Sequence, residues 1–333
     1  MPLNLNINGR TMPARFGETL VDAALSEGVL IPHDCATGQC ETCRVRVAHG
    51  SVDDRGTSYG DTVLACQARI IGDVAITMEE LPAPVTEKGV VEAITELGPR
   101  VVELAIRLRN PLAYRPGQYA RLGFAGFPAR DYSFSAPMQT DLEPDLLIFQ
   151  IRILRQGLVS TALGKGIDLG HAVKVSGPFG HAYLRTQENG PLVLTASGTG
   201  FGPIWALARA ATLADRNRSL SVIAGIRTPD DAYMRPAFDW LRDHGKEDIT
   251  VSTQNGAEGK TLGKMALEQG EADSHLPQLN ETTSLHVAGN PAMVERVKTR
   301  ALAARARCYA DPFTAATTKP TLLQRGRNFL RRM

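Results

Sequence analysis

Four of the five cysteines have a spacing that suits an iron–sulfur cluster. Three of them, Cys35, Cys40 and Cys43, lie in the run C-A-T-G-Q-C-E-T-C, and Cys66 follows after 22 intervening residues. The spacing C-x4-C-x2-C with a distant fourth cysteine is that of plant-type 2Fe–2S proteins. Gly38 lets the short loop curl tightly, so that backbone N–H groups can face the sulfurs. Such a cluster carries single electrons, and other parts of the chain must supply them.

Other uses of these cysteines explain the pattern less well. A disulfide framework does not fit, because five cysteines among 333 residues are few and the N-terminus does not read as a signal peptide. A four-cysteine zinc site usually has two C-x2-C pairs, and only Cys40 and Cys43 form one. A Rieske site would need two histidines, so we interpret His33 as a local hydrogen-bonding residue. The fifth cysteine, Cys308, is expected to be a packed thiol.

Length, composition and charge predict a soluble protein of two or three domains. A chain of 333 residues exceeds the usual size of one hydrophobic core, and no apolar run approaches the ~20 residues of a membrane-spanning helix. Residues 1–80 hold 6 Lys and Arg against 11 Asp and Glu, whereas residues 314–333 hold five basic residues and no acidic one. Aromatic residues are not interleaved with the basic ones, so nucleic-acid binding is not expected. We predict a cytoplasmic monomer without membrane attachment.

The first 80 residues read as a small α+β unit. The strands expected there are Leu3–Ile7, Thr11–Phe16, Arg44–Ala48 and Val74–Met78. A hairpin turn is predicted at Asn8-Gly9, and Thr19–Glu27 has helical periodicity. The segment L-P-A-P-V, which contains Pro82 and Pro84, then predicts a stiff linker.

Two further units follow the linker. Between residues 85 and 186, many short strands with Gly and Pro turns are typical of an antiparallel barrel. The strands expected there are Val90–Leu97, Arg100–Leu108, Gln118–Phe124, Asp131–Ser135, Leu146–Leu154 and Ala172–Ser176. Between residues 190 and 313, strands alternate with helices, which predicts a parallel, doubly wound sheet. The strands expected there are Leu192–Ala196, Leu220–Gly225, Ile249–Thr253 and Leu285–Ala288, and the helices are Pro203–Ala214, Pro236–His244, Leu262–Glu268 and Pro291–Arg305.

A glycine-rich turn in the last unit suits a nucleotide. From Thr195 to Pro203 the chain reads T-A-S-G-T-G-F-G-P, where a strand enters the turn and a helix follows. Such a turn lets the backbone and a helix N-terminus approach a pyrophosphate. The string differs from the G-x-G-x-x-G fingerprint, so an ordinary βα turn is the alternative.

A second motif lies in the strand-rich unit, where the chain reads A-R-D-Y-S-F-S from Ala129. On a strand, Arg130 and Tyr132 would point to one side and Asp131 and Ser133 to the other. Taken alone, this composition is also that of an ordinary β-strand.

Six motifs in this order resemble the ferredoxin–NADP reductase superfamily. They are R-D-Y-S from Arg130, G-L-V-S from Gly157, G-P-F-G from Gly177, S-G-T-G-F-G-P from Ser197, A-G-N-P from Ala288 and Y-A-D-P-F from Tyr309. With the N-terminal cysteines, the chain resembles the fused reductases of bacterial multicomponent oxygenases. The resemblance implies a β-grasp plant-type 2Fe–2S ferredoxin domain (α+β) at 1–82, an antiparallel β-barrel FAD domain at 85–186, an α/β doubly wound NAD(P)H-binding domain at 190–313 and a basic tail at 314–333.

The resemblance implies electron flow from a nicotinamide to a protein acceptor. NAD(P)H would pass hydride to FAD, and single electrons would leave through the 2Fe–2S cluster. The acceptor would be a terminal oxygenase (a Rieske dioxygenase, or a di-iron or cytochrome P-450 monooxygenase) or its ferredoxin, as in aromatic hydrocarbon catabolism. Two alternatives stay open: a reductase of a non-oxygenase system such as sugar deoxygenation, and a cluster-bearing relay protein without active flavin.

The resemblance also implies which residues lie at the reacting atoms. Ser133 would hydrogen-bond near flavin N5, which receives the hydride, and Tyr132 would lie against the isoalloxazine. Phe313 would lie against the other flavin face and be displaced by nicotinamide. Arg130 would pair with the flavin pyrophosphate, for which a guanidinium is well suited.

The remaining contacts that the resemblance implies form two groups. The flavin pyrophosphate would meet Gly157, Val159 and Ser160. The nicotinamide nucleotide would meet Thr195, Gly198, Thr199 and Gly200, with Arg227 and Asp231 near its adenosine end. The segment G-I-R-T-P-D-D, which ends at Asp231, has one Arg and two acids. Because a 2′-phosphate favours a basic cluster, we expect NADH rather than NADPH.

Three features depart from the family pattern. Relatives often carry Cys-Gly-x-Pro beside the nicotinamide, whereas this chain has A-G-N-P from Ala288, so no thiol can act there. Glu41 stands where relatives often have Gly and adds a negative charge beside the cluster cysteines. The chain also continues for twenty residues beyond Phe313, whereas the flavin-stacking residue often ends the chain.

Overall fold

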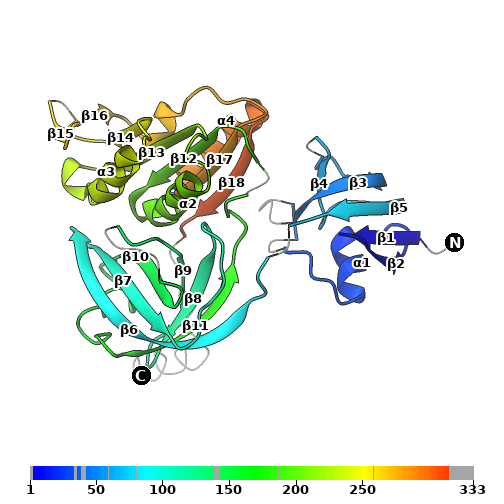
Figure 1. Ribbon diagram of the computed structural model, residues 1–333, viewed down its shortest axis with the longest axis horizontal. Helices are drawn as coiled ribbons and strands as arrows, with labels where there is room; N and C mark the ends of the chain where they lie inside the picture. The colour runs from blue at the N-terminus through cyan, green and yellow to red at the C-terminus, as the bar shows by residue number, and fades with distance from the viewer. Residues whose placement is uncertain are drawn as a thin grey trace, which may run out of the picture.

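The computed structural model of this chain describes residues 3–33, 36–38, 43–58, 60–79, 81–138, 143–185, 188–257 and 259–314. Its described strands form three sheets, each built from one continuous stretch of chain (Figure 1). Figure 1 shows the N-terminal sheet, in blue, beside the other two units, with the third sheet above the barrel. This architecture confirms the predicted fold class, while the exact domain boundaries stay a prediction. Within the described ranges, no helix combines the length and hydropathy that crossing a bilayer requires.

The N-terminal sheet consists of β1 (Leu3–Ile7), β2 (Arg10–Ala14), β3 (Arg44–Asp53), β4 (Thr62–Leu64) and β5 (Arg69–Thr77), in the order β2-β1-β5-β3-β4. Strands β1 and β5 are parallel and the other neighbours are antiparallel. Helix α1 (Leu20–Ser26) buries one face against this sheet, and the Thr19 hydroxyl caps it by accepting from the Asp22 N–H. Asn8 and Gly9 have φ values of 51° and 90°, which makes the predicted hairpin turn.

The barrel consists of β6 (Val85–Gly98), β7 (Val101–Leu108), β8 (Tyr119–Phe124), β9 (Arg130–Ser133), β10 (Leu146–Arg152) and β11 (Ala172–Phe179). The strands are antiparallel, in the order β10-β7-β6-β11-β8-β9. The sheet curls until the Ser135 N–H donates to the Ile148 carbonyl at 2.8 Å, which brings its two edges together. Phe124, Phe134 and Phe149 fill the interior.

The third sheet consists of β12 (Leu192–Ser197), β13 (Leu220–Ile226), β14 (Ile249–Thr253), β15 (Thr261–Leu262), β16 (Met265–Gln269), β17 (Ser284–Gly289) and β18 (Arg307–Pro312). Its helices are α2 (Phe201–Ala214), α3 (Arg235–Asp243) and α4 (Pro291–Ala303), with short 3-10 turns η1 (Gly198–Gly200), η2 (Pro229–Asp231) and η3 (Ala272–His275). The order is β15-β16-β14-β13-β12-β17-β18, and only the β15–β16 pair is antiparallel.

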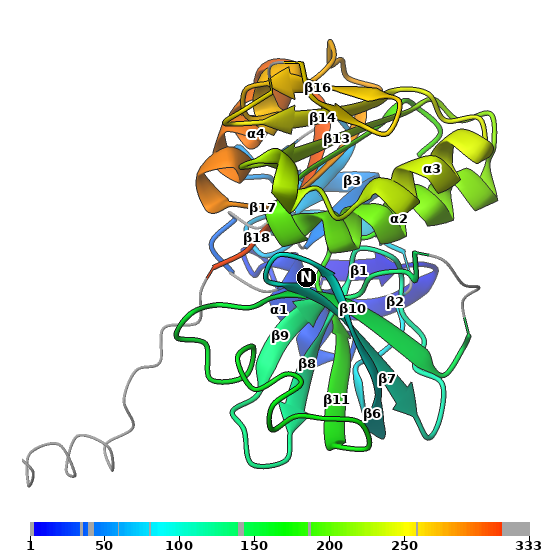
Figure 2. The same ribbon diagram turned by 90° about the vertical axis from the view of Figure 1, so that its left-hand side faces the viewer.

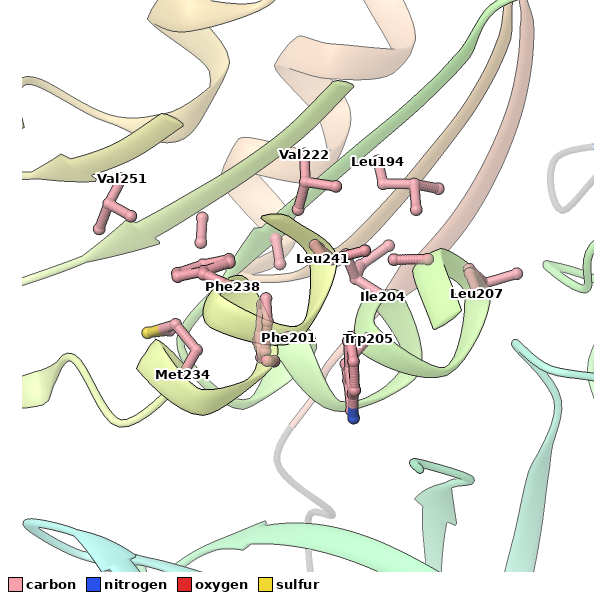
Figure 3. Packing of buried hydrophobic residues seen from close by; sticks show 14 of the residues in the cluster. Leu194, Phe201, Ile204, Trp205, Leu207, Val222, Met234, Phe238, Leu241 and Val251 are labelled. Atoms are coloured by element: carbon pink, nitrogen blue, oxygen red, sulfur yellow. The ribbon is translucent and has the colours of Figure 1, made fainter. Parts of the chain in front are cut away.

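Helices cover both faces of this sheet (Figure 2). Along β12, Leu194 packs with α2 and α3, whereas its neighbour Val193 packs with α4, because successive side chains of a strand point to opposite faces. In Figure 3, Phe238 of α3 lies between the helices and the strands, and Phe201 of α2 packs against it with 5.2 Å between the ring centroids. The Trp205 ring points away from the sheet, and its Nε1 donates to the Ala136 carbonyl of the barrel at 3.0 Å (Figure 3). The start of α2 therefore rests on the barrel.

The helix predicted over Leu262–Glu268 is wrong, since this segment forms the hairpin of β15 and β16. Gly263 has a φ of 63° and reverses the chain there. Met265 and Leu267 are buried and alternate with exposed residues, which is the period of a strand. Strand β18 is an element that the sequence pattern did not predict.

A buried carboxyl in the barrel leads to a prediction about stability. Glu103 on β7 lies opposite Gln150 on β10, and its Oε2 has no hydrogen-bond partner among the described residues. Burial raises the pKa of Glu103 from 4.5 to about 7. The folded state therefore binds this proton more tightly than the unfolded state. The contribution of protonated Glu103 to folding stability is fully present below about pH 4.5. It is lost as the pH rises through 7.

We expect Glu103→Gln to stabilise the protein at pH 8 by about 1–3 kcal/mol, with a much smaller gain at pH 5. Denaturant unfolding of both proteins at the two pH values measures this difference. Glu92→Gln is the control of opposite sign, because Arg107 lowers the pKa of Glu92. An equal effect of Glu103→Gln at both pH values would contradict the prediction.

Candidate functional site

Two of the four cluster cysteines meet because β3 pairs with β4. Cys43 immediately precedes β3. Cys66 follows β4, with one residue, Ala65, between them. The antiparallel pairing of Arg44 with Leu64 brings them together, and the Cys66 N–H donates to the Cys43 Sγ at 3.3 Å. Both thiols are buried. Cys35, Cys40 and Glu41 lie outside the described residues.

The described part of the cysteine loop is held by Gln67. Its Nε2 donates to the Ala36 carbonyl at 2.9 Å and lies 3.7 Å from the Cys66 Sγ. Gly38 has a φ of 79°, and a Cβ there would lie 3.0 Å from the Gln67 Cγ. Buried sulfurs with N–H donors directed at them are the surroundings that a thiolate-bound cluster needs. The residues present therefore fit a 2Fe–2S cluster.

The predicted flavin residues lie where the barrel meets the third sheet. The Ser133 Oγ on β9 donates to the Asp311 Oδ2 on β18 at 2.8 Å. Burial raises the pKa of Asp311 to about 6, and the hydrogen bond from Ser133 partly opposes this shift. Tyr132 packs on the barrel core, and burial raises its pKa to about 12. Phe313, two residues after Asp311, donates its N–H to the Gly289 carbonyl at 2.7 Å.

The two charged residues of the R-D-Y-S motif differ in their partners. Asp131 is exposed and accepts two hydrogen bonds from Arg121, at 2.7 and 2.9 Å. Arg130 donates to the Ala129 carbonyl and has no carboxylate partner among the described residues. A guanidinium without a carboxylate is suited to phosphate oxygens, so Arg130 fits the flavin pyrophosphate.

The G-L-V-S loop is shaped from within by its own residues. The Ser160 Oγ accepts from the Leu154 N–H at 3.1 Å, and a Cβ at Gly157 would lie 2.4 Å from this oxygen. Val159 is buried in the barrel core. Val159 and Ser160 therefore fix the loop, and Gly157 is needed for its tight path.

The glycine-rich turn packs directly against the A-G-N-P segment. Gly198 has a φ of 55°, and a Cβ at Gly200 would lie 2.3 Å from the Ala288 carbonyl oxygen. The Asn290 N–H donates to the Ser197 Oγ at 2.9 Å. Thr199 lies in η1 between the two glycines, whereas Thr195 is fully buried in β12 and its hydroxyl has no hydrogen-bond partner in the described part of the chain. The turn is thus held against the end of β17, and Thr195 lies in the sheet beneath it.

Charged residues surround the predicted adenosine end. Arg227 Nε lies 3.7 Å from the Asp231 Oδ2, which also accepts from the Thr228 Oγ1 at 3.3 Å. Arg152, at the end of β10, lies beside them. Burial lowers the pKa of Arg152, and the nearby cations Arg227 and Arg100 lower it further. An arginine beside other cations fits a site that receives an anionic ligand.

Comparison with known proteins agrees with this geometry. A family model of the 2Fe-2S iron-sulfur cluster binding domain matches residues 3–70, and one of the oxidoreductase NAD-binding domain matches residues 194–299. The ferredoxin–NAD(P)(+) reductase component of the naphthalene 1,2-dioxygenase/salicylate 5-hydroxylase systems of a Ralstonia species is 34% identical over 310 residues, which covers 88% of this chain and 90% of the relative. The chain belongs to the ferredoxin–NAD(P)+ reductase family of oxygenase components.

Further members and structures support the assignment to this reductase family. The reductase component of the naphthalene 1,2-dioxygenase system of Pseudomonas putida is 32% identical over 319 residues, covering 90% of this chain and 93% of the relative. An Amycolatopsis cytochrome P-450 reductase has a TM-score of 0.65 and 25% identity, covering 95% of this chain and all of that one. The ferredoxin reductase of carbazole 1,9a-dioxygenase, at 22% identity and a TM-score of 0.63, shares the fold. This reductase is an NAD(P)H-dependent oxidoreductase with FAD and a 2Fe–2S cluster.

Sequence reasoning did not select two residues of this site. Asp311 lies within the motif Y-A-D-P-F, but only the fold shows that it meets Ser133, 178 residues earlier in the chain. Arg152 is a charged residue at the end of a strand whose five preceding residues are all buried. Its position directly after this buried run is the signal that could have identified it.

Proposed function

We propose that this reductase oxidises NADH at the junction of its last two domains and releases single electrons from its N-terminal domain to an oxygenase system. The observation that carries the proposal is the contact of Ser133 on the barrel with Asp311 on β18 at 2.8 Å. It joins the predicted flavin strand to the sheet that has the glycine-rich turn. FAD, when bound, accepts a hydride and gives up single electrons, and the cluster transfers them one at a time.

The residues of the chain bind and orient in this proposal. Arg130 and the loop at Gly157 hold the flavin pyrophosphate, and Ser133 hydrogen-bonds at the reacting edge of the ring. Phe313 covers the ring until nicotinamide replaces it, and the turn from Gly198 to Gly200 binds the nucleotide. Hydride transfer depends mainly on such alignment.

The purified holoprotein provides the test. NADH should bleach the flavin absorption and then the cluster absorption, and cytochrome c should be reduced catalytically. A preparation that contains both cofactors but whose flavin is not bleached by NADH would exclude the proposal. It would instead favour the relay protein without active flavin.

The acceptor is proposed from the family. The relatives in Ralstonia and Pseudomonas putida are named as components of naphthalene dioxygenase systems. We therefore propose a ring-hydroxylating dioxygenase or its ferredoxin as the electron acceptor. We also propose that the domains of this reductase span residues 1–82, 85–186 and 190–313. Product formation by such a dioxygenase, reconstituted with this reductase and NADH, tests the acceptor. A cytoplasmic location and a monomeric state stay predictions.

The Arg227–Asp231 pair leads to a prediction about the nucleotide. Asp231 lies 3.7 Å from Arg227, a cation that could otherwise attract a 2′-phosphate, so we expect NADH to be preferred. Asp231→Ala should free the guanidinium and raise kcat/KM for NADPH about 10-fold, with a smaller change for NADH. Steady-state kinetics with both nucleotides measure this. Asp230→Ala, the neighbouring carboxylate, is the control, and a wild-type preference for NADPH would contradict the assignment.

A further inference from the structure

A line of charged and aromatic side chains joins the ferredoxin domain to both other domains. Glu79, near the end of the ferredoxin domain, accepts from Arg115 of the barrel, with 2.7 Å between Oε1 and Nη1. The two side chains are only 20% and 28% exposed, so water and salt screen this pair less than a surface pair. The ion pair therefore fixes one domain against the next.

The line continues from Arg115 to the third sheet. The Arg115 guanidinium lies 5.7 Å from the Tyr183 ring centroid. Arg185 lies 4.3 Å from the same centroid and 3.7 Å from that of Tyr309 on β18, and such distances allow cation–π attraction. We call the side chains of Glu79, Arg115, Tyr183, Arg185 and Tyr309 the junction column.

The column is mounted on rigid backbone at the barrel. The buried Gln118 accepts from the Arg115 N–H at 2.8 Å and donates to the Gly180 carbonyl at 3.3 Å. Gly117 has a φ of 96°, and a Cβ there would lie 2.1 Å from the Ala182 carbonyl oxygen. The turn that carries Arg115 is thus packed against the segment that carries Tyr183.

The column is equally fixed at the third sheet. Tyr309 donates to Glu188 with 2.5 Å between the oxygens, and the His286 ring centroid lies 4.8 Å from that of Tyr309. Arg185 donates to two carbonyls of its own segment, those of His181 and Tyr183. Tyr309 lies two residues before Asp311, so the column ends beside the site of hydride transfer.

We propose that the junction column positions the ferredoxin domain for electron transfer from the flavin site to the cluster. This inference rests on the proposed function. Glu79 and Arg115 are not among the residues proposed to hold a cofactor, so they act as positioning residues. Electron transfer slows steeply as the separation of donor and acceptor grows, and a covalent linker alone leaves that separation free to vary. The ion pair and the cation–π contacts hold it constant.

The test separates flavin reduction from electron exit. Each NADH oxidised to NAD⁺ and H⁺ supplies two electrons, which reduce two ferric cytochrome c molecules through the cluster, or two ferricyanide ions that can accept at the flavin. In Glu79→Gln we expect cytochrome c reduction to fall about 10-fold, because Arg115 loses its charged partner and the ferredoxin domain is no longer held at one separation. NADH-dependent ferricyanide reduction and flavin content should stay at the wild-type level. Stopped-flow bleaching of the cluster should show the same loss.

Two further variants keep the test decisive. Asp61→Asn breaks the Arg46–Asp61 ion pair, which has the same 2.7 Å length but lies within the ferredoxin domain, and it should have no effect. The exchanged pair, Glu79→Arg with Arg115→Glu, should recover most of the cytochrome c activity that either single change removes. Equal loss of both activities in Glu79→Gln, or unchanged cytochrome c reduction, would overturn the inference. Failure of the wild-type protein to reduce cytochrome c would instead contradict the proposed function.

Discussion

Replacing Cys66 by Ser should abolish electron delivery to cytochrome c while NADH still reduces the flavin. Cys66 lies in direct contact with Cys43, and the two thiols approach the same point from β3 and β4. Changes in the outer partners of metal ligands already cost roughly 10–100-fold, so loss of a ligand should lower cytochrome c reduction by at least about 100-fold. The cluster absorption should be lost with the activity.

The fifth cysteine provides the matched control for this experiment. Cys308 lies on β18, packed beside α4, and outside the predicted ligand set. Cys308→Ser should therefore leave both cofactors and both activities unchanged. If Cys66→Ser also abolished flavin reduction by NADH, the cysteine would be required for the whole fold rather than for the exit of electrons.

Replacing Asp311 by Ala should slow the reduction of the flavin by NADH. Asp311 accepts the hydrogen bond of Ser133, the residue proposed to hydrogen-bond near flavin N5. Without it the Ser133 hydroxyl can rotate, and we expect hydride transfer to slow by about 10–100-fold. Stopped-flow bleaching of the flavin measures this rate. Ser133→Ala should have a similar effect, and the double variant should be little worse than either single one.

The pH profile distinguishes the charge of Asp311 from its position. The pKa of Asp311 is raised to about 6, so the carboxyl loses its proton between pH 5 and 7. Asp311→Asn keeps an oxygen that accepts from Ser133 but has no titrating group. Any change in the rate of flavin reduction that the wild-type protein shows between pH 5 and 7 should therefore be absent in this variant. Asp131→Asn, in the same motif but paired with Arg121 on the exposed side, is the control. A rate in Asp311→Ala equal to that of the wild-type protein would exclude this role.

Local patterns predicted much of the fold but failed where long-range packing decided the structure. The turn at Asn8-Gly9 and the helix that begins after Asn290 have strong local determinants, and both are present. The segment Leu262–Glu268 is compatible with a helix by composition, but pairing of β16 with β14 makes it a strand. Strand β18 has little apolar periodicity of its own and is stabilised by its parallel pairing with β17.

The sequence by itself determined the order of the three domains and the set of four cysteines, because these depend on motifs a few residues long. It also identified Ser133, Phe313 and the glycine-rich turn through the family resemblance. Only the tertiary structure decided which of these side chains meet. The contact of Ser133 with Asp311 spans 178 residues, and the ion pair of Glu79 with Arg115 crosses a domain boundary. Such contacts depend on how sheets and domains pack against one another, and no local spacing records that packing.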